Sequence, residues 1–205
     1  MIGTMPDDAA IKTLDSRQLC EAVWRENPGA RVLNLGCGEQ SWGENGRYIG
    51  ADIFPGRFVD VMVDLDGGKL PFRTGTFDIV MLDQVVEHLL NLVPLVQDCH
   101  RVLKDGGYLY ITTPHFSNLS SWVDPTHHKH YSLHSFGFLF WEEKKVFTFP
   151  SIDGGFRRVC EEITFADKQW FAKFLYGLSS RRYEKYYCKL IPARGIKVIG
   201  RKTKC

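Results

Sequence analysis

A pair of glycines and a later aspartate form the pattern with the clearest chemistry in this chain. One apolar run leads into Gly36-Cys37-Gly38, and a second apolar run ends at Asp52. Glycine lets a backbone pass close to a ligand because it carries no Cβ. A carboxylate at the end of the next strand accepts hydrogen bonds from both hydroxyls of a ribose. The pattern therefore predicts a site for a cofactor that carries a nucleoside.

The spacing of the glycines distinguishes between kinds of cofactor. A dinucleotide site uses a third glycine so that a pyrophosphate rests on a helix N-terminus, and this chain has Ser41 at that position. The Gly-Lys-Ser/Thr of a phosphate-binding loop is also missing from the sequence. S-Adenosylmethionine has no phosphates, so a turn with two glycines and a ribose acid favours that cofactor.

Apolar runs and turn residues predict the elements that must position this site. Strands are expected at 31–35, 48–52, 59–63, 77–82, 107–113, 159–165 and 195–199, and helices at 16–26, 93–103, 132–140 and 168–190. Asp15 or Ser16 is suited to cap the first helix, and the last helix is expected to break near 177–180. The alternation predicts an α/β fold: a Rossmann-like, doubly wound, mostly parallel seven-stranded sheet with helices on both faces and an antiparallel edge hairpin.

Two connections in this sheet are shorter than a parallel crossover requires. About nine residues separate Gly38 from Tyr48, and about six separate Asp52 from Val59, whereas a parallel crossover takes a dozen or more. The crossovers after the first and second strands are therefore expected to be shortened or replaced by loops. The sheet would be thin there or covered by a partner chain, and a homodimer is one arrangement that would cover it.

Further segments extend the pattern beyond the glycine turn. In chain order they are Val63-Asp64-Leu65, Leu70-Pro71-Phe72, Thr76-Phe77-Asp78-Ile79-Val80, Val86-Glu87-His88-Leu89 and Leu103-Lys104-Asp105-Gly106-Gly107. Together with the turn, they resemble the class I S-adenosylmethionine-dependent methyltransferases of the type 11 kind, over residues 30–115. Asp105 departs from this pattern, in which proline is commoner.

The resemblance implies S-adenosylmethionine as the cofactor and assigns the positions that bind it. By this resemblance, Gly36, Cys37 and Gly38 pass under the methionine part, and Asp52 and Ile53 hold the ribose. Asp64 and Leu65 lie at the adenine, and Asp83 and Gln84 line the methionine end. Cys37 is interpreted as a small filler residue rather than a nucleophile. Glu87 and His88 are interpreted as a brace for the helix that follows them.

Histidines gather after the fifth predicted strand, where the acceptor side of the site is expected. They are His115, His127, His128, His130 and His134. Three interpretations are open: the histidines bond loop backbone, they deprotonate an acceptor hydroxyl, or they bind a metal together with Asp124. No His-Glu-x-x-His spacing supports a metal, so none is predicted. For a catalytic base, His115 is the first choice because it directly follows the strand end, and His130 and Asp124 come next.

The segments around these histidines resemble a subgroup of the same methyltransferases. This subgroup is associated with sugar and polysaccharide biosynthesis. The segments that resemble it are Thr113-Pro114-His115, the run from Asp124 to Ser132, and the run from Ile191 to Val198. The resemblance implies methyl transfer to a small-molecule or glycan-precursor acceptor, at a hydroxyl.

Other functions remain open on the sequence alone. A lipid-precursor or nucleic-acid methyltransferase is one alternative, although the fourth strand ends in Leu82-Asp83-Gln84-Val85 and lacks the Asn/Asp-Pro-Pro-Tyr motif of base-flipping enzymes. A non-catalytic module that binds S-adenosylmethionine is another. A nicotinamide oxidoreductase is the least favoured, because the third glycine is missing.

The C-terminal part of the chain combines positive charge with aromatic residues. Residues 181–205 hold nine Lys or Arg against one acid, Glu184, in a chain with a net charge of +2. This is interpreted as a solvated helix face and a lysine-protected edge strand, although nucleic acid, an anionic membrane or an anionic acceptor would use the same charge. Helical spacing assigns the aromatic residues to the core, with an acceptor lid as the alternative; they are Trp122, Tyr131, Trp141, Trp170, Phe171, Phe174, Tyr176, Tyr183, Tyr186 and Tyr187.

Length and composition set the remaining expectations. The 205 residues predict a single domain over 1–205, with a cofactor-binding core at 1–115 and an acceptor side at 116–205. No apolar run approaches about 20 residues, so no membrane span is expected. The six cysteines include no Cys-x-x-Cys pair, which argues against a disulfide framework and a zinc cluster. A cytoplasmic location is expected.

Overall fold

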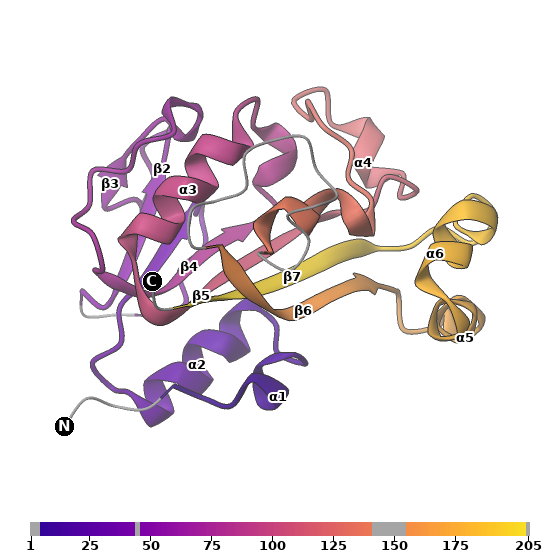
Figure 1. Ribbon diagram of the computed structural model, residues 1–205. Helices are drawn as coiled ribbons and strands as arrows, with labels where there is room; N and C mark the ends of the chain where they lie inside the picture. The colour runs from indigo at the N-terminus through magenta and orange to yellow at the C-terminus, as the bar shows by residue number, and fades with distance from the viewer. Residues whose placement is uncertain (1–4, 44–45, 141–154, 204–205) are drawn as a thin grey trace.

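A computed structural model describes residues 5–43, 46–140 and 155–203. Its centre is a seven-stranded sheet with the strand order β3-β2-β1-β4-β5-β7-β6 (Figure 1). The strands are β1 (Val32–Leu35), β2 (Tyr48–Asp52), β3 (Val61–Met62), β4 (Phe77–Asp83), β5 (Leu103–Pro114), β6 (Phe156–Thr164) and β7 (Gly195–Lys202). The strands from β1 to β5 pair in parallel, and β7 lies antiparallel between β5 and β6. The predicted Rossmann-like sheet with an antiparallel edge pair is confirmed.

The helical segments lie before, between and after these strands. They are α1 (Asp8–Ile11), α2 (Ser16–Glu26), α3 (Leu92–Val102), α4 (Ser120–Val123), α5 (Trp170–Leu178) and α6 (Ser180–Arg182), with the 3-10 turns η1 (Leu65–Gly67), η2 (Val86–His88) and η3 (Leu133–Leu139) and the π-helical turn η5 (Tyr183–Tyr187). Asp15 caps α2 as predicted: its side chain accepts from the Gln18 amide, and the Gln18 side chain accepts from the Asp15 amide. The predicted break in the last helix is confirmed at Ser179, which is extended (ψ 114°).

The central strand β4 sends alternate side chains to the two faces of the sheet. Ile79 and Met81 belong to the core that includes the buried stripe of α2, whereas Val80 and Leu82 belong to the core that includes the buried side of α3. All six residues from Phe77 to Leu82 are buried. The end of β4 is therefore fixed from both faces, and with it the place where the following residues leave the sheet.

The two short connections at one edge of the sheet are loops, as expected. Among the described residues of 36–47 and 53–60, none is helical. β3 is shorter than predicted, because only its two residues pair with Ala51 and Asp52. β5 is longer than predicted: it begins at Leu103, and its register against β4 shifts between Phe77 and Ile79. No helix of the described chain has the length and apolar character needed to cross a bilayer.

The segment before α2 is tied to the C-terminal strands. Asp8 pairs with Arg157 and with Arg201, and it also accepts a 2.9 Å hydrogen bond from the Tyr108 hydroxyl. These contacts hold α1, which the sequence did not predict, against β5, β6 and β7. The N-terminal segment thereby lies beside strands whose contacting residues are 100 to 193 positions further along the chain.

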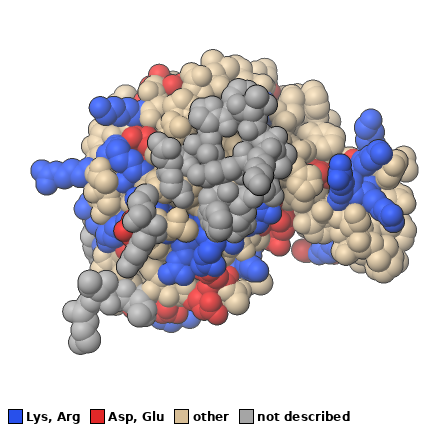
Figure 2. Space-filling view, in the orientation of Figure 1, with Lys and Arg blue, Asp and Glu red and all other residues tan. Residues whose placement is uncertain are grey.

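A helical hairpin, residues 168–194, joins β6 to β7 and contains α5, α6 and η5. It projects from the end of these strands (Figure 1), and Lys and Arg side chains gather on the projection (Figure 2). Tyr131 and Tyr183 are buried as expected. The core assignment is wrong for six other aromatic residues, which are exposed: Trp122, Trp170, Phe171, Phe174, Tyr186 and Tyr187. The hairpin buries only part of its surface, through residues such as Ala172 and Cys188; Trp141 lies outside the described residues.

Candidate functional site

The turn after β1 depends on its glycines. Gly36 and Gly38 have φ of 69° and 49°, in the left-handed region that favours glycine. A Cβ on Gly36 would lie 2.4 Å from Cγ2 of Val85, whereas a Cβ on Gly38 would meet nothing within 4 Å. The amides of Gly36 and Cys37 donate to the Ala51 carbonyl at 2.7 and 3.2 Å. The turn is thus fastened to the end of β2 and lies against Val85.

The thiol of Cys37 is turned away from solvent. Its Sγ lies 3.5 Å from the Phe58 carbonyl, to which it donates, and the side chain is buried. Burial, assisted by the nearby carboxylate of Asp52, raises the pKa of the Cys37 thiol to about 11. A thiol with this pKa is protonated at neutral pH, which suits a small filler residue beneath the turn.

Asp52 is oriented by the same turn. Its Oδ2 accepts from the Gly38 amide at 2.9 Å, and its Oδ1 accepts from the Phe54 amide at 3.1 Å. Each carboxylate oxygen has a second lone pair for a ligand. The predicted ribose carboxylate is therefore held in one orientation by backbone that belongs to the glycine turn and to its own loop.

A cavity of about 450 Å³, which we call the smaller cavity, lies over this turn. The predicted positions that line it are Gly36, Asp52, Ile53, Asp64, Leu65 and Gln84, and it is also lined by Phe54, Asp66, Val85, His88, Leu89, Thr126 and His128. Its volume falls in the usual range for a small-ligand site, about 300–1,000 Å³. The structure thus brings Gly36 of the predicted floor together with the ribose and adenine positions around one space, whereas Cys37, Gly38 and Asp83 do not line it.

The residue after β4 has a strained backbone. Gln84 has φ 59°, the only positive φ among the described residues other than glycine, and such conformations cluster at functional sites. Its Nε2 donates to Thr112 Oγ1 at 2.9 Å, and the Thr112 hydroxyl donates to Asp83. Gln84 lines the smaller cavity and also a larger one, whereas Asp83 lines the larger one. These two neighbours therefore mark the junction of the two spaces.

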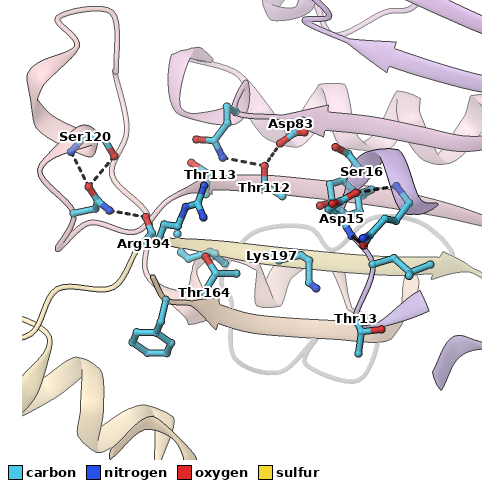
Figure 3. A pocket seen from close by; sticks show the side chains of 18 of the residues that line it. Thr13, Asp15, Ser16, Asp83, Thr112, Thr113, Ser120, Thr164, Arg194 and Lys197 are labelled. Carbon is cyan, nitrogen blue, oxygen red and sulfur yellow. Dashed lines mark hydrogen bonds between the residues drawn. The ribbon is translucent and has the colours of Figure 1, made fainter. Parts of the chain in front are cut away.

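The larger cavity, of about 890 Å³, lies at the ends of β4, β5 and β7 (Figure 3). Residues 13–16 and Gln18 line it on one side, and residues 164, 165, 167 and 194–197 line it on the other. Figure 3 shows Arg194 and Ser120 at one end and Asp15 and Ser16 at the other, with Thr112 between them. Lys197, which is buried, pairs with Glu162 at 2.8 Å. The lining is rich in hydroxyls, amides and charged groups.

The structure places His115 outside this cavity, and no described residue that lines it is a histidine. His115 is fully buried. Its Nε2 lies 3.0 Å from Glu184 Oε1, and its Nδ1 lies 2.8 Å from Ser117 Oγ. Both ring nitrogens are therefore engaged, and the pair joins the end of β5 to the helical hairpin. This position favours the interpretation in which the histidine is structural, and its predicted role as a base stays a prediction.

The two other predicted catalytic residues lie in the loop that follows α4. His130 is exposed, stacks on Trp122 with ring centroids 3.7 Å apart, and has Nδ1 2.9 Å from Ser121 Oγ. Asp124 accepts from the Thr126 hydroxyl at 2.6 Å and from the Thr126 amide at 2.8 Å. These hydrogen bonds lower the pKa of Asp124. Neither residue lines either cavity, so their contacts favour a role in holding the loop.

Three potential ligand atoms meet beside the smaller cavity. One atom from each of Glu87, His88 and His127 lies within 4.8 Å of the others. Nδ1 of His127 lies 3.1 Å from the Ser121 carbonyl, which only accepts, so Nδ1 carries the proton and Nε2 has the lone pair of the neutral ring. Glu87 is buried and accepts from Thr113 at 3.0 Å, and burial raises its pKa. The hydrogen bond from Thr113 ties Glu87 of η2 to the end of β5, and its predicted role as a brace for the following helix stays a prediction.

Comparisons with known proteins place this geometry in a family context. Residues 33–111 match a family model described as a methyltransferase domain. A Mycolicibacterium smegmatis protein named as a probable S-adenosylmethionine-dependent methyltransferase is 34% identical over 100 residues, which cover 42% of this chain and 38% of that protein. A ubiquinone biosynthesis O-methyltransferase of Xanthomonas oryzae is 30% identical over 103 residues, covering 42% and 43%. The chain thus spans less than half the length of these relatives.

A solved structure extends the likeness to most of the chain. The crystal structure of an S-adenosylmethionine-dependent methyltransferase from Archaeoglobus fulgidus has a TM-score of 0.52 and 25% identity, and covers 91% of this chain and 95% of its own. The strand order and the glycine turn define a Rossmann-like domain with a nucleoside site. The comparisons show that residues 33–111 are similar to a methyltransferase domain and that the chain is similar to S-adenosylmethionine-dependent methyltransferases, which supports S-adenosylmethionine as the cofactor.

Several site residues were not predicted from the sequence. Thr112 and Asn118 line the larger cavity, and so does the segment 13–16. The sequence identifies Asp15 as a helix cap, but nothing near it indicates that the cap stands beside β5 and β7. For Thr112, its place near the end of a predicted parallel strand was a usable signal, because ligands bind at the carboxyl ends of such strands.

Proposed function

We propose that this chain transfers a methyl group from S-adenosylmethionine to a hydroxyl of a small-molecule or glycan-precursor acceptor. The observation that carries the proposal is the pair of neighbouring cavities that share Gln84, one at the glycine turn and the other over the ends of β4, β5 and β7. A transferase needs two such spaces with a common boundary, so that the cofactor and the acceptor meet there. A cofactor-binding module without turnover would need only the first.

The residues around the smaller cavity fit S-adenosylmethionine. Gly36 lines the smaller cavity, so a ligand there can lie against its backbone, and Asp52 presents a fixed carboxylate to a ribose. Bound there, the cofactor supplies an electrophilic methyl group on a sulfonium. The protein must then hold an acceptor atom in line with that methyl group and keep water away. Gln84, fixed by Thr112 at the boundary, is placed to shape the approach.

The chemistry of the larger cavity supports a hydroxylated acceptor. Its described lining includes the side chains of Asp15, Asp83, Asn118 and Lys197, which donate and accept hydrogen bonds as a polyhydroxy compound requires. The name of the Xanthomonas relative, an O-methyltransferase, supports oxygen as the acceptor atom. A largely apolar acceptor would find fewer partners here, which favours the glycan-precursor class.

Asp83 is the residue that we assign to the acceptor hydroxyl. It is the carboxylate next to Gln84, and Thr112 orients it by donating to Oδ1. Its carboxylate is placed to accept a hydrogen bond from the acceptor and to take its proton as the oxygen is methylated. His115 was the base predicted from the sequence, so Asp83 and His115 are the two residues that an experiment must separate.

Radiolabelled methyl transfer and calorimetric titration test the proposal. The purified chain is titrated with S-adenosylmethionine and with NAD(P), then incubated with labelled cofactor and pools of hydroxylated acceptors. We expect binding of S-adenosylmethionine only, and transfer that Asp83→Asn slows about 10²- to 10⁴-fold while cofactor affinity is kept. His115→Gln, the matched variant, is expected to keep most turnover. Failure of folded protein to bind the cofactor at millimolar concentration would refute the proposal, and normal turnover of Asp83→Asn would refute the assigned base.

A further inference from the structure

The helical hairpin carries a dense group of exposed apolar side chains. Among the described residues, fourteen large hydrophobic side chains are exposed, and seven of them lie between 170 and 190: Trp170, Phe171, Phe174, Leu178, Tyr186, Tyr187 and Leu190. Trp170 is 72% exposed and Leu190 is 80% exposed. Single exposed apolar residues need no explanation, but a contiguous group marks a surface that contacts a partner.

The same hairpin is strongly cationic. Residues 168–194 include Lys168, Lys173, Arg181, Arg182, Lys185, Lys189 and Arg194 and a single acid, Glu184. That acid faces inward, where it accepts from Leu133 N at 2.7 Å and lies 3.0 Å from His115 Nε2. Its charge therefore serves the attachment of the hairpin to the body, and does not neutralise the outer surface.

The cations of α6 and η5 surround a shallow hollow on this projection. Its lining is formed by Ser179, Arg181, Arg182, Lys185 and Tyr186. Arg181, Arg182 and Lys185 are exposed, and no ion pair with a carboxylate is recorded for them within the described chain. A hollow with three unneutralised cations suits an anionic group such as a phosphate. Figure 2 shows the Lys and Arg side chains gathered over this part of the molecule.

We propose that the helical hairpin docks this protein on an anionic lipid bilayer. Aromatic and leucine side chains partition into the interfacial region of a membrane, and nearby Lys and Arg side chains bind anionic headgroups. The hairpin presents both kinds of group on one projection that stands away from the sheet (Figure 1). With no spanning helix in the described chain, the contact is peripheral and reversible.

Two other occupants fit this surface less well. A second copy of the chain, docked symmetrically through the hairpin, would bring two sets of the same cations together without acids to pair with them. A nucleic acid would satisfy the cations and could stack on the aromatic rings. It would leave exposed Leu178 and Leu190, at 69% and 80%, without an apolar partner. A bilayer alone covers the aliphatic, aromatic and cationic groups together.

The position of the hairpin connects this surface to the site. Phe165 and Asp167, just before the hairpin, and Arg194, its last residue, line the larger cavity. Asn118 Nδ2, from the same cavity, donates to the Ala193 carbonyl at 3.0 Å. If the proposed function holds, a docked hairpin places the acceptor cavity next to the bilayer. The acceptor would then be a hydroxylated headgroup carried on a lipid, which deepens the proposed function and rests on it.

Vesicle sedimentation of the full chain tests the docking without any assay of activity. The vesicles contain phosphatidylcholine alone or phosphatidylcholine with phosphatidylglycerol, each at low and high salt. We expect binding to the anionic vesicles, weakened by salt, and little binding to the neutral ones. Each cation removed from the contact is expected to weaken binding about fivefold, so Arg181→Ser with Lys185→Ser should lose about 25-fold. The control Arg25→Ser with Arg73→Ser removes the same charge from exposed positions elsewhere and should change little.

A second pair of variants tests the apolar part of the contact. Phe174→Ser with Leu178→Ser should weaken binding at every salt concentration, whereas Met62→Ser with Leu90→Ser, exposed at the other end of the sheet, should not. Trp170 fluorescence should shift to the blue on anionic vesicles, and Trp170→Phe should abolish that shift. Circular dichroism confirms that each variant is folded.

Several outcomes would overturn the docking proposal. They are no binding to anionic vesicles by folded protein, equal losses in the hairpin and control variants, or tight binding to RNA or DNA with none to vesicles. A dimer that protects Trp170 from an aqueous quencher would also overturn it. If docking is confirmed but the cofactor does not bind, the proposed function fails and the docking stands. If vesicles bearing a lipid-linked acceptor give no more methyl transfer than the soluble acceptor, only the proposal that the acceptor is carried on a lipid fails.

Discussion

The two cavities are built in different ways. In the smaller one, the glycine turn and the carboxylate come from neighbouring stretches of chain: the Gly38 amide that fixes Asp52 lies 14 positions away. The larger one depends on contacts between distant segments, such as Lys197 with the Lys12 carbonyl over 185 positions and Asn118 with the Ala193 carbonyl over 75. A site of the first kind can be recognised from a short sequence pattern, whereas the residues of a site of the second kind are scattered along the chain.

The two cavities should therefore differ in how well they tolerate substitution. We expect a cofactor that never changes to be bound by main-chain geometry, which depends on a few glycines and one carboxylate. The acceptor side consists of loops and a projecting hairpin attached to a rigid sheet, and such segments accept substitution without loss of the fold. We therefore expect variants of the smaller cavity to have larger effects on binding than single variants of the larger one.

The largest effect is expected at Gly36. Gly36→Ala forces an alanine into φ near 69°, which costs about 1–2 kcal/mol, and puts its Cβ 2.4 Å from Val85 Cγ2, which adds about 1–3 kcal/mol of overpacking. Urea unfolding should show the loss of stability, and calorimetry should show the loss of cofactor affinity. Gly38→Ala is the control: it shares the strained φ but has no neighbour within 4 Å of its Cβ. Equal losses of stability and affinity in both variants would show that the contact with Val85 does not cause them.

The second largest effect is expected at Asp52. Asp52→Asn keeps the size of the side chain but removes its charge and one acceptor oxygen, so cofactor binding should weaken by about 1.5–3 kcal/mol, the scale of hydrogen bonds to charged groups. Titration with S-adenosylmethionine measures this change. Asp105→Asn is the matched control, because Asp105 is more than half exposed and lines neither cavity. Unchanged affinity of Asp52→Asn would remove the ribose assignment.

The sequence predicts the fold and the cofactor side because both depend on local signals. Burial of β4 on both faces, the capping box at Asp15 and the positive φ of the two glycines follow from residue types at short spacing. His115 shows where this reasoning stops. Its place after a strand suggested a base, but its partner Glu184 lies 69 positions away, and no local pattern reveals that contact. The exposed aromatic residues of the helical hairpin were assigned to the core for a related reason, because helical spacing alone does not show whether anything packs against the helix.

Two glutamates, the buried Glu87 and the partly buried Glu184, provide a test whose expected effect is of intermediate size. Burial alone would raise the pKa of Glu184, but the hydrogen bonds from His115 and the Leu133 amide outweigh it, and its pKa lies below the usual 4.5. Its contribution to stability is therefore full above about pH 4.5 and is lost as the pH falls through its folded-state pKa. Glu184→Gln should cost about 1–2 kcal/mol at neutral pH and loosen the hairpin.

Glu87 should behave in the opposite way. Burial raises its pKa above 4.5, so its contribution favours folding at low pH and is lost as the pH rises through its folded-state pKa. Glu87→Gln should therefore stabilise the protein by about 0.5–1 kcal/mol at neutral pH and not below pH 4.5. Urea unfolding of the wild type and both variants across this pH range gives the comparison. Parallel pH profiles for the two variants would contradict these environments.

The smallest effect is expected from a chelator. Glu87, His88 and His127 are close enough to share a cation, but Glu87 is engaged by the Thr113 hydroxyl, and a sulfonium methyl group needs no Lewis acid to react. We therefore expect methyl transfer to be unchanged after dialysis against EDTA. A loss that a divalent cation restores, and that His127→Gln reproduces, would instead make this trio part of the site. The smaller cavity would then also depend on a contact between distant segments of the chain, and the contrast between the two cavities would be weaker.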